Sequence, residues 1–232
     1  MYLSKLVIDP TSREFRRDYA DVREMHRTVM SAFGEVANDE PARQAHAVLW
    51  RLDNAQRGFT QYVQSGSEPD WSRLPSGYVS GAPEVRSMQP VLDAIAPGRR
   101  FAFRLVANPT RTIARVDAPP RLDGKRPQGR KVPLRKPDDQ VCWLVRQAER
   151  CGFIIPTGAN GQPDLAPSPC PTSTGRRRAG DAGSITVEPV RFEGHLVVID
   201  TALFTTAIRD GIGRAKAYGC GMISLAPART PT

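Results

Sequence analysis

His26 is the residue of this sequence best suited to acid–base chemistry, because an imidazole with an ordinary pKa of about 6.5 both accepts and donates protons near neutral pH. Arg23 and Arg27 flank it, and Arg16 and Arg17 come shortly before. A phosphate held by these arginines would lie beside a group of a kind that typically accelerates reactions by about 10²–10⁴-fold. The alternative is a hydrogen-bonded, half-buried histidine, since His26 falls on an apolar stripe.

The segment 211–221 is the second candidate for phosphate chemistry. Glycines adopt positive φ and can turn backbone N–H groups toward an anion, and cations in the same loop add charge. The dinucleotide-binding fingerprint fails here, because Lys216 occupies the place of its third glycine. A tight connection between a helix and a strand is the alternative. The residues expected to bind phosphate in this loop are Gly211, Gly213, Arg214, Lys216, Gly219 and Gly221.

A basic segment at 121–136 and a run of three arginines at 176–178 are further candidates for binding phosphates, although solvated loops would look the same. Each phosphate neutralised by such cations steepens the salt dependence of binding. In the first segment the cations are opposed only by Asp123, and they are Arg121, Lys125, Arg126, Arg130, Lys131, Arg135 and Lys136.

The whole chain is basic, with 33 Lys and Arg against 24 Asp and Glu and a formal net charge of +9 over 232 residues. This balance favours polyanionic partners, nucleic acid before an acidic membrane surface. No apolar run approaches the roughly 20 residues of a membrane-spanning helix, and the first residues lack the pattern of a signal peptide. We therefore expect a cytoplasmic protein.

The remaining histidines, cysteines and tryptophans favour structural roles. His46 and His195 lie where strands are expected. The four cysteines are scattered without a C-x-x-C pair, which argues against a zinc site and for reduced thiols. Trp50 and Trp143 are more typical of a core than of base stacking. The cysteines are Cys142, Cys151, Cys170 and Cys220.

Two helices are predicted with clear ends. The first begins at Asp21, which can cap it with Glu24 three residues later, and it ends before Gly34 with His26 on one face. The second spans about 138–151 and stops at Gly152. A shorter helix is expected around 203–208.

Strand patterns surround these helices. Residues 2–8, 84–88, 101–106 and 222–225 favour strands, residues 48–52 and 59–64 favour a hairpin, and residues 185–192 and 195–199 favour a second hairpin turning at 193–194. The Pro-, Gly- and Ser-rich stretch 156–184 is expected to be a mobile loop.

Each half thus follows the order strand, helix, two paired strands, a weak helix or loop, and strand. That order predicts an α+β protein of two tandem ferredoxin-like βαββαβ domains, at residues 1–92 and 98–232. One face of such a sheet is free to bind RNA, as in RNA-recognition motifs, although their aromatic signature is absent here.

Several motifs together make the chain recognisable. It resembles the CasE-type CRISPR repeat-RNA endoribonucleases, RAMP-superfamily subunits of type I-E Cascade, from Met1 to about Pro227. The helix bearing His26 and the glycine-rich loop are the most specific elements. The resemblance rests on Met1-Tyr2-Leu3-Ser4-Lys5-Leu6, Arg16-Arg17-Asp18 to Met25-His26-Arg27, Leu49-Trp50-Arg51-Leu52, Pro69-Asp70-Trp71, Phe103-Arg104-Leu105 to Ala107-Asn108-Pro109-Thr110, and Gly211 to Gly221 with Leu225-Ala226-Pro227.

The resemblance implies cleavage of the CRISPR precursor transcript at the 3′ base of each repeat hairpin, without a metal or cofactor, after which the guide RNA stays bound within Cascade. The ribose 2′-OH attacks the phosphate and leaves a 2′,3′-cyclic phosphate, with His26 as the acid–base residue. Arg23 stands where some relatives carry a tyrosine, and it shares a helix face with His26, so it is expected to stabilise charge on the phosphate. Arg104 is expected to contact RNA.

Two other classes of function stay open on the sequence. One is an RNA-binding subunit that holds a guide without cutting it, which burial of His26 would favour. The other is a basic scaffold protein, in which the glycine-rich loop is only a turn. A small-molecule substrate and a membrane partner are not expected.

Overall fold

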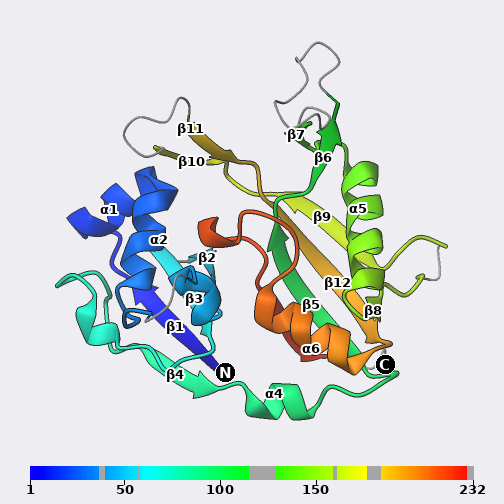
Figure 1. Ribbon diagram of the computed structural model, residues 1–232, viewed down its shortest axis with the longest axis horizontal. Coiled ribbons are helices and arrows are strands. Elements are labelled where there is room, and N and C mark those ends of the chain that lie inside the picture. The colour runs from blue at the N-terminus through cyan, green and yellow to red at the C-terminus, as the bar shows by residue number, and fades with distance from the viewer. Residues whose placement is uncertain (37–39, 57, 115–128, 159–160, 177–183, 229–232) are drawn as a thin grey trace.

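The computed structural model contains two antiparallel sheets that lie side by side, connected by the short helix α4 (Gln89–Asp93) (Figure 1). The structure describes residues 1–36, 40–56, 58–114, 129–158, 161–176 and 184–228. Predicted site residues Lys125 and Arg126 lie outside these ranges, as do two arginines of the 176–178 run.

The first sheet consists of β1 (Tyr2–Ile8), β2 (Leu49–Ala55), β3 (Gly58–Ser65) and β4 (Glu84–Ser87) in the order β2-β3-β1-β4. Helices α1 (Arg13–Ala20), α2 (Val22–Met30) and α3 (Ala42–Ala45) lie between β1 and β2 in the chain. Alternate residues of the strands face a core in which Leu6 and Val63 pack with Phe15 and Met25 of the helices. Burying each such side chain contributes about 1.5–3 kcal/mol.

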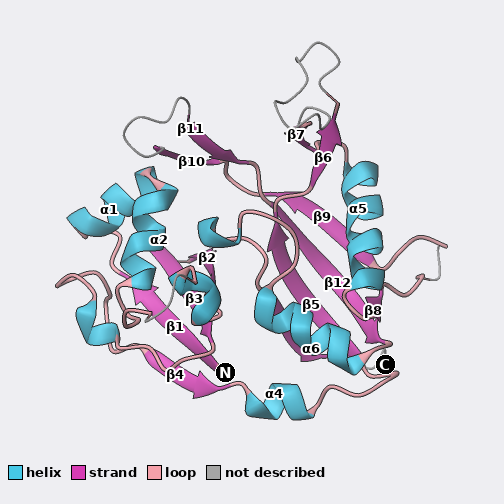
Figure 2. Cartoon of the chain, in the orientation of Figure 1, coloured by secondary structure: helices cyan, strands magenta, loops and turns pink. Residues whose placement is uncertain are grey.

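The second sheet has the order β13-β5-β12-β8, with β9 (Leu165–Pro169) also paired to β12. Its strands are β5 (Arg100–Ala107), β8 (Phe153–Ile154), β12 (Val190–Val198) and β13 (Ile223–Pro227). Helices α5 (Pro137–Arg150) and α6 (Thr201–Asp210) pack on it, with Leu144 and Phe204 fully buried. Figure 2 shows both helices beside this sheet.

Both sheets therefore have the strand order of a βαββαβ unit, and the predicted α+β fold with two ferredoxin-like halves is confirmed. The halves differ in their second helix. The second half has α6 before its last strand, whereas the described residues between β3 and β4 form only the single 3-10 turn η1 (Trp71–Arg73).

Two hairpins extend from the second half. One is made of β6 (Thr110–Ile113) and β7 (Arg130–Pro133), and the other of β10 (Ser173–Arg176) and β11 (Ser184–Val187). Residues 156–184 were expected to form a mobile loop, and the loop assignment was wrong where the strands β9 and β10 lie within it. Helix α1 was not predicted at all.

The predicted hairpin with its turn at 193–194 was also wrong. Residues 190–198 form the continuous strand β12, and β11 pairs with β10 instead. Gly194 lies inside β12, where a β-carbon would come within 2.1 Å of the Asp164 carbonyl oxygen. The glycine thus permits close passage of a neighbouring backbone rather than a chain reversal.

The two halves are joined by polar contacts between their sheets and helices. The Gln64 side-chain amide of β3 donates to the Ile208 carbonyl of α6 at 2.7 Å, and Arg51 of β2 donates to Ser224 Oγ of β13 at 2.9 Å. Among the described helices, none is long and apolar enough to cross a membrane.

Candidate active site

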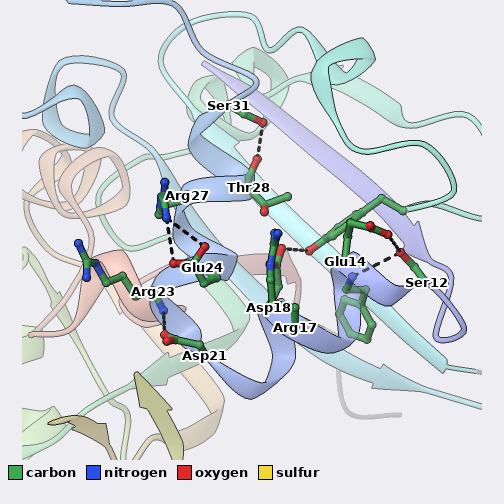
Figure 3. Close-up of polar contacts among 12 residues, drawn as sticks. Ser12, Glu14, Arg17, Asp18, Asp21, Arg23, Glu24, Arg27, Thr28 and Ser31 are labelled. Carbon is green, nitrogen blue, oxygen red and sulfur yellow. Dashed lines mark hydrogen bonds and ion pairs between the residues drawn. The ribbon is translucent and has the colours of Figure 1, made fainter. Parts of the chain in front are cut away.

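Helix α2 carries His26 and is fixed at its N-terminus from two sides. The Asp21 carboxylate accepts a hydrogen bond from the Arg23 backbone N–H at 3.0 Å, which caps the helix as the sequence predicted (Figure 3). The same carboxylate accepts the Arg176 backbone N–H of β10 at 3.2 Å. A strand from the second half is thereby attached to the helix of the candidate catalytic histidine.

His26 itself is half-buried, and its Nδ1 atom is buried without a hydrogen-bond partner in the described part of the chain. Burial lowers the pKa of the imidazole to about 4, and the positive charge of Arg43 contributes to the same shift. His26 is therefore neutral at physiological pH. A neutral imidazole is the form that accepts a proton.

Arg43 is the cation whose charge reaches this histidine from another element, and Lys216 lies near Arg43 on an element that packs against α2. Arg43 lies in α3, where its guanidinium donates to the Val48 carbonyl at 3.3 Å, and Lys216 opens the 3-10 turn η2 (Lys216–Tyr218), which packs against α2. Burial lowers the pKa of both side chains, and Arg43 lowers that of Lys216 further, while the carboxylate of Asp210 opposes both shifts.

Arg43 was missed by sequence reasoning. It lies 17 positions after His26, in a helix of one turn with no periodic pattern. Only the fold brings it to the histidine. The single available signal was an arginine just before a predicted strand, which is too common to single out a site.

The glycine-rich loop runs between the two halves, and η2 is drawn orange-red between the sheets in Figure 1. Gly213 and Gly219 have φ of +85° and +79°, and a β-carbon on either would lie within about 3 Å of a tryptophan ring, Trp143 or Trp50 respectively. Gly211 and Gly221 also have positive φ. These glycines permit close packing against both halves, while Arg214 is exposed and Lys216 half-buried.

The arginines near His26 differ in how they are engaged. Arg17 is ion-paired with the buried Asp18 at 2.7 Å, Arg16 binds carbonyls of Thr11 and Ser12, and Arg27 binds Glu24. These three are held within the helices.

Arg23 is different from the three arginines just described. Its guanidinium has no hydrogen bond or ion pair among the described residues, and Figure 3 shows it reaching away from α2. It is the arginine of this helix that is free to meet a phosphate.

Arg104 lines a cavity of about 570 Å³ between the halves, to which Val22 and Met25 of α2 also contribute. It donates to Asp53 at 3.2 Å and to Glu193 at 2.7 Å, and Asp53 also holds Arg51 at 2.8 Å. Arg104 is thus part of a charged network across the interface. Its predicted contact with RNA stays a prediction.

The described cations of the basic segment gather around the β6–β7 hairpin. Arg130, Arg135 and Lys136 line a hollow of about 400 Å³ together with Arg111. Arg130 and Lys131 are exposed, and Lys131 binds the Thr112 hydroxyl. Arg135 is paired to Glu188 through two hydrogen bonds of 2.8 and 2.9 Å. This hairpin is separate from the residues around His26.

The other histidines and the tryptophans, for which structural roles were expected, are hydrogen-bonded or buried. His46 binds Ser67 Oγ at 2.9 Å and the Gly34 carbonyl at 3.0 Å, and His195 binds Asp164 at 2.9 Å. Trp50 and Trp143 are buried. The described part of the chain brings no three His, Cys, Asp or Glu side chains together as a metal site, and its cysteines are free thiols.

Known proteins share this architecture along almost the whole chain. The family model "CRISPR associated protein" matches residues 1–227. The CRISPR-associated endoribonuclease Cse3 of Thermus thermophilus is 36% identical over 98% of this chain and all of its own length. The Cascade subunit CasE of Escherichia coli K12 is 32% identical over 79% of this chain and 91% of its own.

Solved structures agree with the sequence matches. Cse3 bound to a 19-nucleotide RNA superposes with a TM-score of 0.76 at 35% identity, over 98% of this chain and 100% of that one. Cas6e of Escherichia coli superposes with a TM-score of 0.65 at 26% identity, over 98% of this chain and 100% of that one. A chain of a CRISPR RNA-guided surveillance complex superposes with a TM-score of 0.67 at 25% identity, also over 98% of this chain and 100% of that one. On these grounds the chain belongs to the family of CRISPR associated proteins.

Proposed function

We propose that this protein is an endoribonuclease that binds the hairpin of a CRISPR repeat in precursor crRNA and cleaves it at the 3′ base of the stem. The observation that carries the proposal is a half-buried imidazole, His26, beside the cation Arg43 and on a helix that packs against the Lys216-bearing turn η2, in a chain of this family. The resulting guide RNA stays bound, and the partners are the other Cascade subunits. Because its substrate is a cellular transcript, we place the protein in the cytoplasm.

The chemistry follows from what the site holds. The nucleophile is the 2′-OH of the substrate, so the protein has to align it, move protons and stabilise charge on the phosphate. His26 accepts the proton of the 2′-OH, since its lowered pKa keeps it in the basic form. Arg23, whose guanidinium is unpaired within the described residues, stabilises the phosphorane oxygens.

Binding of the repeat stem is assigned to the second half. The exposed Arg130 and Lys131 on the β6–β7 hairpin, with Arg135 at the start of α5, carry positive charge suited to the phosphates of an A-form duplex. In the same proposal, residues 1–92 and 98–232 are the two domains, and the glycine-rich loop, with Gly211, Gly213, Arg214, Lys216, Gly219 and Gly221, lies along the RNA path between them.

The second candidate function is a subunit that holds a guide without cutting. Burial of the His26 Nδ1 atom favours it, because a substrate cannot reach that atom without a rearrangement. The scaffold alternative is weaker, since Arg214 of the glycine-rich loop is exposed and Lys216 is only half-buried.

The deciding experiment is cleavage of a labelled CRISPR-repeat hairpin in excess EDTA by wild type and His26→Ala, with binding measured alongside. A substrate with a 2′-deoxy sugar at the scissile position is the control for the nucleophile. We expect cleavage that either change abolishes while binding persists. Tight binding without cleavage by wild type would establish the guide-holding subunit instead.

A further inference from the structure

The reaction proposed above leaves one proton without a source. When the 2′-oxygen attacks phosphorus, the bond from phosphorus to the 5′-oxygen breaks, and that oxygen needs a proton to leave as a 5′-OH. His26 begins the reaction neutral and takes up the 2′-OH proton, so it cannot supply a second proton in the same step. Another group has to carry a labile proton at this place.

Lys216 is the side chain whose position fits this requirement. It opens η2, which packs against helix α2 of His26, and its aliphatic stem lies against the backbone of Gly221, at 3.2 Å from the point where a β-carbon would stand. Its ammonium has no hydrogen bond or ion pair to any described residue. A half-buried, unpaired ammonium therefore lies on the element that faces the catalytic helix.

Its electrostatic surroundings favour proton donation. Burial and the nearby Arg43 lower the pKa of Lys216 below its ordinary value, while Asp210 and Cys151 oppose the shift. A lysine so placed releases its proton more readily than one on the surface, and catalysis is most effective when the pKa of the donor approaches the working pH. The charged groups on the catalytic helix itself are Arg23, Glu24 and Arg27.

The geometry points to Lys216 as the general acid that protonates the leaving 5′-oxygen, opposite His26 as the general base. This inference rests on the proposed endoribonuclease function and adds a catalytic residue to it. In the balanced step, the 2′-OH proton passes to His26, the new bond forms between the 2′-oxygen and phosphorus, and the bond from phosphorus to the 5′-oxygen breaks. The Lys216 ammonium gives that oxygen its proton, and exchange with water restores both residues.

The test compares two repeat hairpins that differ in the leaving atom, one with the ordinary 5′-oxygen and one with a bridging 5′-sulfur at the scissile phosphate. A thiolate leaves without protonation because thiols are far more acidic than alcohols. Single-turnover rates would be measured for wild type, His26→Ala, Lys216→Met and Lys216→Arg. Lys5→Met, which removes an exposed lysine paired with Glu84 across strands β1 and β4, is the matched control.

We expect Lys216→Met and Lys216→Arg to slow the oxygen substrate by about 10²-fold or more and to cleave the sulfur substrate within a few-fold of the wild-type rate. The arginine variant keeps the charge but cannot give up its proton. His26→Ala should be slow on both substrates, and Lys5→Met should match wild type.

Equal slowing of both substrates by Lys216→Met, or full activity of Lys216→Arg on the oxygen substrate, would overturn the proton-donor role and leave a charge-binding one. If wild type cleaves neither substrate, the endoribonuclease proposal fails, and this inference falls with it. Thermal melts of the variants show whether a loss of activity reflects unfolding.

Discussion

A β-carbon on Gly219 would lie 2.9 Å from Cζ3 of Trp50, so the glycine-rich loop of the second half touches the indole of β2 directly. Gly219 also has a φ of +79°, which side chains rarely adopt. The contact fixes η2, and with it Lys216, against the first half.

Gly219→Ala should therefore lower the free energy of unfolding by about 1–3 kcal/mol. The same substitution should slow RNA cleavage. The matched control is Gly77→Ala, because Gly77 has a similar φ of +72° but nothing within 4 Å of its would-be β-carbon. The Gly77 variant measures the free-energy cost of placing alanine at a positive φ without any steric contact. Equal destabilisation of the two variants in urea titrations would show that the contact with Trp50 contributes nothing.

The buried imidazole predicts a loss of stability in weak acid. The pKa of His26 is about 6.5 when unfolded and about 4 in the folded protein, so the unfolded state binds more protons between those values. Its contribution is fully present above pH 6.5 and is lost as the pH falls toward 4, on the order of 3 kcal/mol. His26→Asn removes this titration, so unfolding curves of the variant should depend less on pH over that window. A wild-type stability that is flat there would contradict the burial.

Arg23→Ala should slow cleavage more than it weakens binding of the repeat hairpin, because its unpaired guanidinium is assigned to the charge that develops on the phosphate. Arg27→Ala is the comparison on the same helix, since Arg27 is bound to Glu24 and should change cleavage less. Single-turnover rates and binding isotherms on the same RNA give both quantities. Parallel losses in rate and affinity would assign Arg23 to binding alone.

Asp53→Asn should destabilise the interface between the halves. Asp53 holds both Arg51 and Arg104, and the Arg51 side chain is only 5% exposed. Removing the carboxylate leaves a buried cation without its partner, which typically costs about 3–5 kcal/mol. Replacing both partners, as Arg51→Met with Asp53→Leu, should restore part of the loss. Thermal melts that place Asp53→Asn level with wild type would refute this account.

Arg130→Gln and Lys131→Gln should each reduce the steepness of the plot of log affinity against log salt concentration for the repeat hairpin by about one unit. Cleavage of the bound RNA should be unchanged. Arg135→Gln should have a smaller effect, since its guanidinium is already paired with Glu188. Binding titrations from low to moderate salt would measure these slopes. Slopes equal to that of wild type would place the RNA elsewhere on the surface.

The sequence predicts the helix of His26 well because its signals are local. Asp21 caps the helix, as expected, and buried residues recur at Val22, Met25 and Val29. Most strands of the two sheets were also identified from their alternation, although β8 and β9 were not predicted and β12 was divided by a predicted turn. In these segments, residues close together in the sequence determine which side chains are buried and how the helix is capped.

What the sequence does not reveal depends on contacts between distant segments. Gly194 was taken for a turn residue, whereas it lies inside β12 to let the backbone of Asp164 pass. Strand β10 lacks apolar alternation, yet it is held by β11 and by the Asp21 carboxylate. Arg43 reaches His26 only because the chain folds back before β2.

The two halves have the same strand order but contribute different residues to the proposed active site. In the proposed mechanism the general base, His26, comes from α2 of the first half, and the loop that bears Lys216 comes from the second. Heating that separates the two sheets without unfolding either of them should thus abolish the proposed RNA cleavage, while both halves keep their secondary structure. Inactivation would then precede the loss of the far-ultraviolet circular dichroism signal, and on cooling it would reverse as the halves redocked.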